Sequence, residues 1–151
     1  MIISAKDLNL PWANSPKIPA NFAVADANYF CPKLSMIYDE IYPKYWRWMQ
    51  SIKLTKWMHR WDCDNFADAF KLFACGYYQQ VIESEAEGMG VGVVWYNALD
   101  GQPNAYGHAI NIIYVQNEQN NGFHHIFLEP QTGKELVLSK REFDSIWLVY
   151  I

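Results

Sequence analysis

The sequence has few of the features that define several large classes of protein. It carries three cysteines in 151 residues, an odd number without CxxC spacing, so neither a complete disulfide framework nor a structural zinc site is indicated. No charged and apolar leader opens the sequence, and no apolar run reaches the roughly 18 residues of a membrane span. We therefore expect a cytoplasmic protein with reduced thiols and no membrane partner.

Charged residues are also scarce. They make up 19% of the sequence, and 12 lysines and arginines stand against 16 acidic residues, for a net charge of −4. The only cluster of cations lies between Lys44 and Arg60, where tryptophans are interleaved with it. Because binding to nucleic acid usually needs a clustered basic surface, we expect no nucleic-acid partner. The oligomeric state is left open by the sequence.

Apolar and aromatic residues are abundant, at 51% and 17% of the sequence. A chain of this length and composition forms one domain with a sizeable core, so we take residues 1–151 as a single domain. Residues 1–33 hold four of the seven prolines together with apolar residues, which predicts an irregular arm packed on the core. Residues 34–86 are predicted to be mainly helical, and residues 90–151 mainly antiparallel β.

Two helical segments are predicted from apolar residues at spacings of three and four. The first runs from Ser35 to about Ser51, and Pro43 interrupts it, so we expect two short helices or a kink there. The second runs from Asp62 to about Ser84, because an aspartate at its start can cap the first backbone N–H groups and Phe66, Phe70 and Tyr77 share one face.

After Gly90 the periodicity changes from helical to extended. Strands are predicted at residues 91–96, 106–116, 123–129, 135–138 and 146–151, with one helical turn at 139–142. Helices followed by strands at hairpin spacing are typical of an α+β fold. We expect N-terminal helices packed on an antiparallel sheet of about five strands.

Cys63 is the residue around which the candidate chemistry gathers. It stands between Asp62 and Asp64 at the predicted start of a helix, where backbone N–H groups favour the reactive thiolate although the aspartates oppose it. Its role is open between a nucleophile, a metal ligand (for example zinc with His124 and His125) and a small core residue.

A cysteine nucleophile needs a base and a group that orients the base. His108 is the best candidate among four histidines, because it follows Gly107 near the start of a predicted strand and has small neighbours. Glu129 ends the next strand, so a hairpin would bring its carboxylate near His108. Gln131 follows two residues later, where its amide can support an oxyanion.

Three segments carry a resemblance to a known family: Asp62-Cys63-Asp64-Asn65-Phe66-Ala67, Gly107-His108-Ala109-Ile110-Asn111 and Glu129-Pro130-Gln131-Thr132-Gly133. In this order they resemble papain-like and transglutaminase-like cysteine hydrolases. The resemblance is closest to the family of cysteine peptidase domains that includes the one on the Marasmius oreades mushroom agglutinin. It covers about residues 57–138 and implies a papain-like or transglutaminase-like core.

The resemblance also implies roles for individual residues. Cys63 would be the nucleophile, His108 the base and Glu129 the orienting acid, with Gln131 near the active site. An indole N–H of Trp57 or Trp61 could take the place of papain's oxyanion glutamine. The related agglutinin domain depends on calcium, so a further set of ligands, Asp62, Asp64 and Asp68, could bind Ca²⁺. No other cofactor is implied.

We therefore predict a thiol hydrolase, either a peptidase or an amidase, that acts on a peptide or protein through an acyl-enzyme. An amine acceptor would make it a transamidase. The alternative is a non-catalytic binding or assembly protein, such as a phage or bacterial accessory factor, on a cysteine-peptidase-like scaffold. The aromatic N-terminal region, which the resemblance does not cover, favours that alternative.

Overall fold

Two β-sheets and two long helices dominate the part of the chain described by the structure, a computed structural model covering residues 1–13, 19–99 and 104–151. The helical segments are η1 (Ala5–Trp12, a 3₁₀-helix), η2 (Met36–Ile41, a π-helix), α1 (Tyr42–Ser51), α2 (Cys63–Val81) and α3 (Lys140–Phe143). The strands are β1 (Ile2–Ser4), β2 (Asn21–Ala23), β3 (Asn28–Phe30), β4 (Gly88–Met89), β5 (Val91–Ala98), β6 (Tyr106–Asn117), β7 (Gly122–Glu129), β8 (Lys134–Leu136) and β9 (Leu148–Tyr150).

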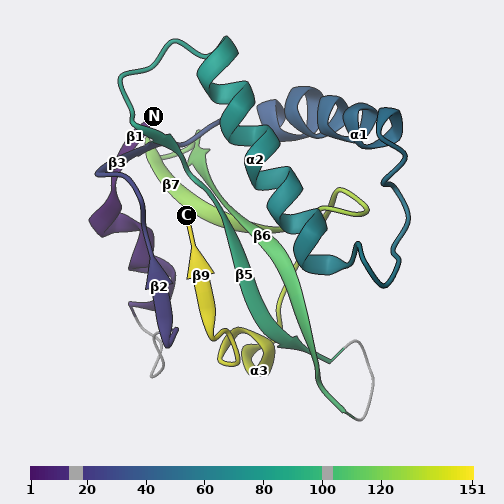
Figure 1. Ribbon diagram of the computed structural model, residues 1–151. Helices are drawn as coiled ribbons and strands as arrows, with labels where there is room; N and C mark the ends of the chain where they lie inside the picture. The colour runs from purple at the N-terminus through teal and green to yellow at the C-terminus, as the bar shows by residue number, and fades with distance from the viewer. Residues whose placement is uncertain (14–18, 100–103) are drawn as a thin grey trace.

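The larger sheet has six strands in the order β2-β9-β5-β6-β7-β8. Neighbours are antiparallel except β2 and β9, which run parallel. Val93 on β5 pairs with Asn111 on β6, and Asn111 pairs with Leu128 on β7. This register sets the start of β5 level with the end of β7 across β6, and the two long helices cover one face of the sheet (Figure 1).

The face under α1 and α2 holds the main hydrophobic core. Phe66 and Phe70 on α2 are completely buried, as are Tyr45 and Met49 on α1. They pack against side chains of β5, β6 and β7 that alternate toward the helices, among them Val91, Ile113, Val115, Ile126 and Leu128. The helical periodicity and the strand alternation of the sequence therefore meet in one layer.

The opposite face is covered by the N-terminal arm. Leu8 and Trp12 on η1 pack with Tyr114 and Val149 of the large sheet, and the Tyr114 hydroxyl donates a hydrogen bond to the Leu8 carbonyl. β1, β3 and β4 form a separate three-stranded sheet beside them. Residues 14–18 of the expected arm lie outside the described residues.

The individual helix and strand predictions are confirmed at residues 35–51, 62–84, 91–96, 106–116 and 123–129, with shifts of a few residues. The division expected at Pro43 is confirmed: the π-helix η2 ends at Ile41 and α1 begins at Tyr42, with Pro43 in the first turn of α1, where proline needs no N–H partner. In the described residues, none of the helices has both the length and the apolar character needed to cross a membrane.

The expected α+β arrangement, with helices before one antiparallel sheet of about five strands, is wrong. Strands β1, β2 and β3 precede the helices, a second sheet is present, and the larger sheet is mixed. The cause is the arm, whose strands of three residues each are too short for a periodic pattern. β2 also pairs with β9 from the far end of the chain, a contact that local sequence does not encode.

Candidate functional site

Cys63 is the first residue of α2, as the sequence predicted. Asp62 precedes it as the N-cap, in an extended conformation, and the Asn65 Oδ1 atom accepts the Asp62 backbone N–H at 3.2 Å. The Cys63 side chain is partly buried against Ala67, Val93 and Ala109. The thiol therefore lies where unpaired N–H groups and the helix dipole favour negative charge.

His108 lies near the start of β6, opposite Tyr96 on β5, and the two rings meet edge to face with centroids 5.8 Å apart. Its Nε2 atom is 2.8 Å from Oε2 of Glu129, and 15% of each of the two side chains is exposed. The Cys63 side chain is a second hydrogen-bond partner of His108. Because Nε2 faces the carboxylate, Nδ1 is the nitrogen left for the thiol.

Glu129 ends β7 and is held by the turn that follows it. Its Oε1 atom accepts the Gln131 backbone N–H at 3.2 Å, and its carbonyl accepts the Gly133 N–H at 2.8 Å. Gly133 has a φ of +69° and lies against the Tyr42 ring, where a Cβ atom would clash. The carboxylate therefore has one oxygen fixed by the backbone and the other directed at His108.

The electrostatics of His108 follow from these contacts. Burial disfavours the charged imidazolium, but the hydrogen bonds and charges of Cys63 and Glu129 outweigh burial and raise the pKa of His108 to about 9. A protonated imidazole beside a thiol attracts a thiolate. The arrangement can therefore hold a thiolate–imidazolium pair with a carboxylate behind it.

The other two thiols lie in different surroundings. Burial raises the pKa of Cys31 to about 12, and burial also raises the pKa of Cys75, an effect that the charge of Lys71 opposes. Both stay protonated near neutral pH. The structure thus brings Cys63, His108 and Glu129 together and leaves the remaining cysteines without such a partner set in the described residues.

The groups predicted to stabilise an oxyanion lie in three different settings. Gln131 contributes its backbone N–H to Glu129. Trp57 is 59% exposed in the loop before α2, so its indole lies largely in solvent. Trp61 meets Phe66 edge to face, and its Nε1 atom is buried without a hydrogen-bond partner among the residues that the structure describes.

The predicted calcium ligands divide into two places. Asp62 and Asp64 share a hydrogen bond that raises the pKa of Asp62, whereas Asp68 accepts a hydrogen bond from the Tyr150 hydroxyl. Within residues 1–13, 19–99 and 104–151, no group of three or more His, Cys, Asp or Glu side chains is gathered to hold a metal ion. Calcium binding by these three carboxylates stays a prediction.

Two residues near the thiol escaped the sequence analysis. Asn111 is completely buried, and its Nδ2 atom donates to the carbonyls of Ala67 at 2.9 Å and Gly92 at 3.1 Å, which ties α2 to β5. The sequence does carry a signal for Asn111, because it is an amide within the apolar run of a predicted central strand. Tyr150 packs against the same small cluster of side chains as Cys63 and also donates a hydrogen bond to Asp68, and only the tertiary fold reveals that position.

Comparison with known proteins gives a family and a fold. The family model of the ricin-type beta-trefoil lectin C-terminal domain matches residues 21–150. A structure of a PSL1a-E64 complex superposes with a TM-score of 0.72 at 17% identity, covering 99% of this chain and 51% of that one. No curated protein matches the chain.

A second structure is that of the Polyporus squamosus lectin bound to the human-type influenza-binding epitope Neu5Acα2-6Galβ1-4GlcNAc. It superposes with a TM-score of 0.69 at 18% identity, covering 99% of this chain and 49% of that one. The chain therefore spans about half the length of these lectin structures and shares the fold of that half.

These comparisons correct several expectations. The family match replaces the papain-like and transglutaminase-like assignment, and the core takes the fold of the lectin structures. The predicted thiol hydrolase, its classification as an enzyme and its peptide or protein substrate are contradicted by these matches to lectins. The alternative of a binding protein agrees better, although the relatives are lectins and not phage or bacterial accessory factors. Three short segments around Cys63, His108 and Glu129 could not define a family.

Proposed function

Because this chain belongs to the ricin-type beta-trefoil lectin C-terminal domain family, we propose that it is a carbohydrate-binding module. The observation that carries the proposal is the match of that family over residues 21–150. The shared fold with a lectin that binds a sialylated trisaccharide supports it. The partner of the chain is then a glycan.

The surface composition suits this role. Saccharide sites combine aromatic faces, which stack on the apolar side of a sugar ring, with a few polar groups for its hydroxyls. Trp57 and Trp147 are 59% and 41% exposed, and Tyr106 is 43% exposed. The net charge of −4 does not favour anionic glycans as partners.

Titration of the chain with glycans tests the proposal. Isothermal titration calorimetry with Neu5Acα2-6Galβ1-4GlcNAc and with Galβ1-4GlcNAc should show saturable binding of at least one of them, and a glycan array should place them in a wider specificity. An unrelated glucan of equal size is the control. A folded chain that binds no saccharide of the array would contradict the proposal.

A second function is favoured by the geometry around α2. We propose that Cys63, His108 and Glu129 form a thiol-activating site, with Cys63 as nucleophile, His108 as its base and Glu129 as the group that orients the imidazole. The 2.8 Å contact between His108 and Glu129 carries this proposal. A lectin module with such a site can capture an electrophilic ligand through its thiolate.

Thiol labelling tests this second proposal. With iodoacetamide at pH 7, Cys63 should react at least roughly tenfold faster than Cys31 and Cys75, whose protonated thiols are poor nucleophiles. E64, the compound in the PSL1a complex, should add to the same residue. Mass spectrometry of tryptic peptides locates the label, and equal labelling of all three cysteines would contradict the assignment.

The three cysteines carry one further proposal. All of them are free thiols, so a reducing, cytoplasm-like compartment suits the chain. Counting free thiols by mass spectrometry under non-reducing conditions, in protein taken from its native source, tests it. A disulfide between chains would contradict it.

A further inference from the structure

We propose that Asn111 is a positioning residue, which holds the Cys63 thiol at a working distance from the His108 imidazole. This inference rests on the proposed thiol site and adds the residue that sets its geometry. Asn111 lies in the middle of β6, the strand that carries His108, and its side chain is completely buried. Within the described part of the chain, no other amide or charged side chain is buried.

The amide of Asn111 lies where the elements of the thiol site meet. Its Nδ2 atom donates to the Ala67 carbonyl on α2 at 2.9 Å and to the Gly92 carbonyl on β5 at 3.1 Å. On its other side Asn111 pairs with Leu128 of β7, the strand that ends in the carboxylate of the site. The elements that carry the thiol, the imidazole and the carboxylate are therefore all in contact with this one residue.

The two acceptors fix the orientation of the amide. Both are carbonyl oxygens, which cannot donate, so the NH₂ group of Asn111 must face them and Oδ1 must point away. Oδ1 is buried and has no hydrogen-bond partner among the residues that the structure describes. An unpaired buried acceptor lowers stability. An apolar side chain of similar size would avoid that penalty but would lose both links, so the amide suits a joint between elements better than a filler of the core.

The helix lies close to the sheet at the thiol. Cys63 packs with Ala67 on α2 and with Val93 and Ala109 on the strands, all three of which are completely buried. Such small side chains offer few contacts that could hold the helix at one height. The hydrogen bond from Asn111 to the Ala67 carbonyl, one turn after Cys63, supplies a fixed length instead. Because a thiol and its base act only within hydrogen-bond reach, a shift of about 1 Å is enough to weaken their contact.

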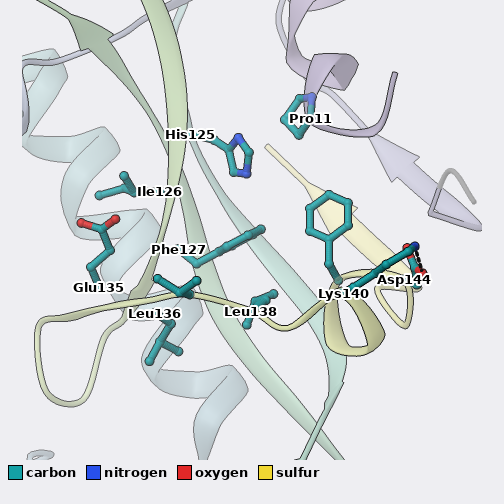
Figure 2. A pocket seen from close by; sticks show the side chains of 11 residues that line it. Pro11, His125, Ile126, Phe127, Glu135, Leu136, Leu138, Lys140 and Asp144 are labelled. Carbon is teal, nitrogen blue, oxygen red and sulfur yellow. Dashed lines mark hydrogen bonds and ion pairs between the residues drawn. The ribbon is translucent and has the colours of Figure 1, made fainter. Parts of the chain in front are cut away.

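A second imidazole shows what His108 would lose if the thiol moved away. His125 lies on β7 in a cleft of about 490 Å³ on the arm face, where Figure 2 shows it near Phe127. Burial lowers the pKa of His125, as expected for an imidazole without an acidic partner. Burial also opposes the charge of His108, but its contacts with Cys63 and Glu129 raise its pKa to about 9. The charge of His108 therefore depends in part on the position of α2.

Several titratable groups surround the thiol and its base, and a substitution at Asn111 changes none of them. They are Asp62 and Asp64 at the start of α2, His108 and Tyr106 on β6, Tyr96 on β5, Glu129 on β7, and Tyr150 on β9 with its partner Asp68. A shifted pH profile of thiol reactivity in an Asn111 variant therefore reports a changed distance between these groups and the thiol.

The test is the rate of Cys63 alkylation by iodoacetamide as a function of pH. Asn111→Leu removes both hydrogen bonds and keeps a side chain of similar size. In the folded fraction, alkylation at pH 7 should slow by about tenfold, and the pH of half-maximal rate should rise by about one unit, because the thiolate loses part of its imidazolium partner. Asn111→Asp should fall between the two, since a buried carboxylic acid stays neutral and can donate one of the two hydrogen bonds.

Tyr114→Phe is the matched control. Tyr114 is also buried on β6, and its hydroxyl donates to the Leu8 carbonyl on the arm face. This variant loses a buried hydrogen bond from the same strand without touching α2. Its alkylation rate and pH profile should stay within about twofold of the wild type, and urea denaturation gives the folded fraction of every variant.

The outcomes separate this inference from the thiol site itself. If His108→Gln slows alkylation but Asn111→Leu keeps the wild-type rate and pH profile, Asn111 only stabilises the fold and the inference is wrong, while the thiol site stands. If Asn111→Leu does not fold, Asn111→Asp decides: a shifted profile supports the inference and a wild-type profile overturns it. If His108→Gln leaves alkylation unchanged, the thiol site and the inference fail together.

Discussion

The two faces of the large sheet differ in what covers them. The helix face lies under α1 and α2, and it carries Cys63 and a cleft lined in part by Trp48, Trp61 and Tyr150. The arm face lies under η1 and short strands, and it buries Trp12 and Leu8 almost completely. Figure 1 shows strand β2 of the arm beside β9.

This difference separates stability from function. On the helix face, reactive groups stand at the end of a helix and at the ends of strands, where backbone groups are free to hold charge. On the arm face, aromatic rings pack on each other, as Trp12 does with Phe143 at 5.7 Å. We expect substitutions on the arm face to change stability alone, and those around Cys63 to change thiol reactivity.

The largest expected effect belongs to the arm face. Trp12→Ala removes a large side chain that is 2% exposed, so the free energy of unfolding should fall by about 3–5 kcal/mol. Urea denaturation followed by circular dichroism measures it. Cys63 labelling in the fraction that stays folded should keep its rate, and a loss of that rate would show that the two faces are coupled.

A smaller effect concerns the pH dependence of stability. The pKa of His108 is raised from 6.5 to about 9, so its contribution to stability is fully present below pH 6.5 and is lost as the pH rises through about 9. The wild-type chain should therefore lose roughly 1–3 kcal/mol more than His108→Gln over this interval. Urea denaturation at pH 6.5 and at pH 9 measures the difference, and parallel losses would contradict the raised pKa.

Asn111 tests the link between α2 and the sheet. Asn111→Ala removes two buried hydrogen bonds, to Ala67 and Gly92, and should lower the free energy of unfolding by about 1–3 kcal/mol. Asn104→Ala, at an exposed position, is the matched control. Hydrogen exchange of the first turns of α2 should accelerate in the Asn111 variant only; unchanged exchange would mean that the link does not hold the helix.

The smallest effect is expected at the cap of α2. Asp62→Ala removes the N-cap carboxylate and should lower stability by about 1 kcal/mol. It also removes a negative charge beside Cys63, so labelling of the thiol should become slightly faster. Thermal denaturation and iodoacetamide kinetics measure the two effects, and Asp39→Ala, at an exposed position, is the matched control. A slower reaction would show that the cap, and not the charge, dominates.

The sequence predicted the helix face well and the arm face poorly. The spacing of Phe66, Phe70 and Tyr77 located α2, and hairpin spacing placed His108 near Glu129. Both are local signals. The pairing of β2 with β9 joins Asn21 to Leu148, and neither segment has a pattern that names the other.

The site shows the same limit. Residues with a strong local context, such as Cys63 at a capped helix start, could be found from the sequence. Tyr150 and Asp68 meet only because β9 lies beside β5 under α2. The family could not be read from three short segments either, since the match that defines it extends over residues 21–150.

The central claim is that Cys63, His108 and Glu129 act as one unit on the helix face. A double-mutant cycle on the rate of Cys63 alkylation at pH 7 tests it, with His108→Gln, Glu129→Gln and the double variant. We predict that His108→Gln slows alkylation by about a hundredfold. If Glu129 acts only through His108, the double variant should react no more slowly than His108→Gln alone. A double variant slowed by the product of the two single effects would contradict the claim.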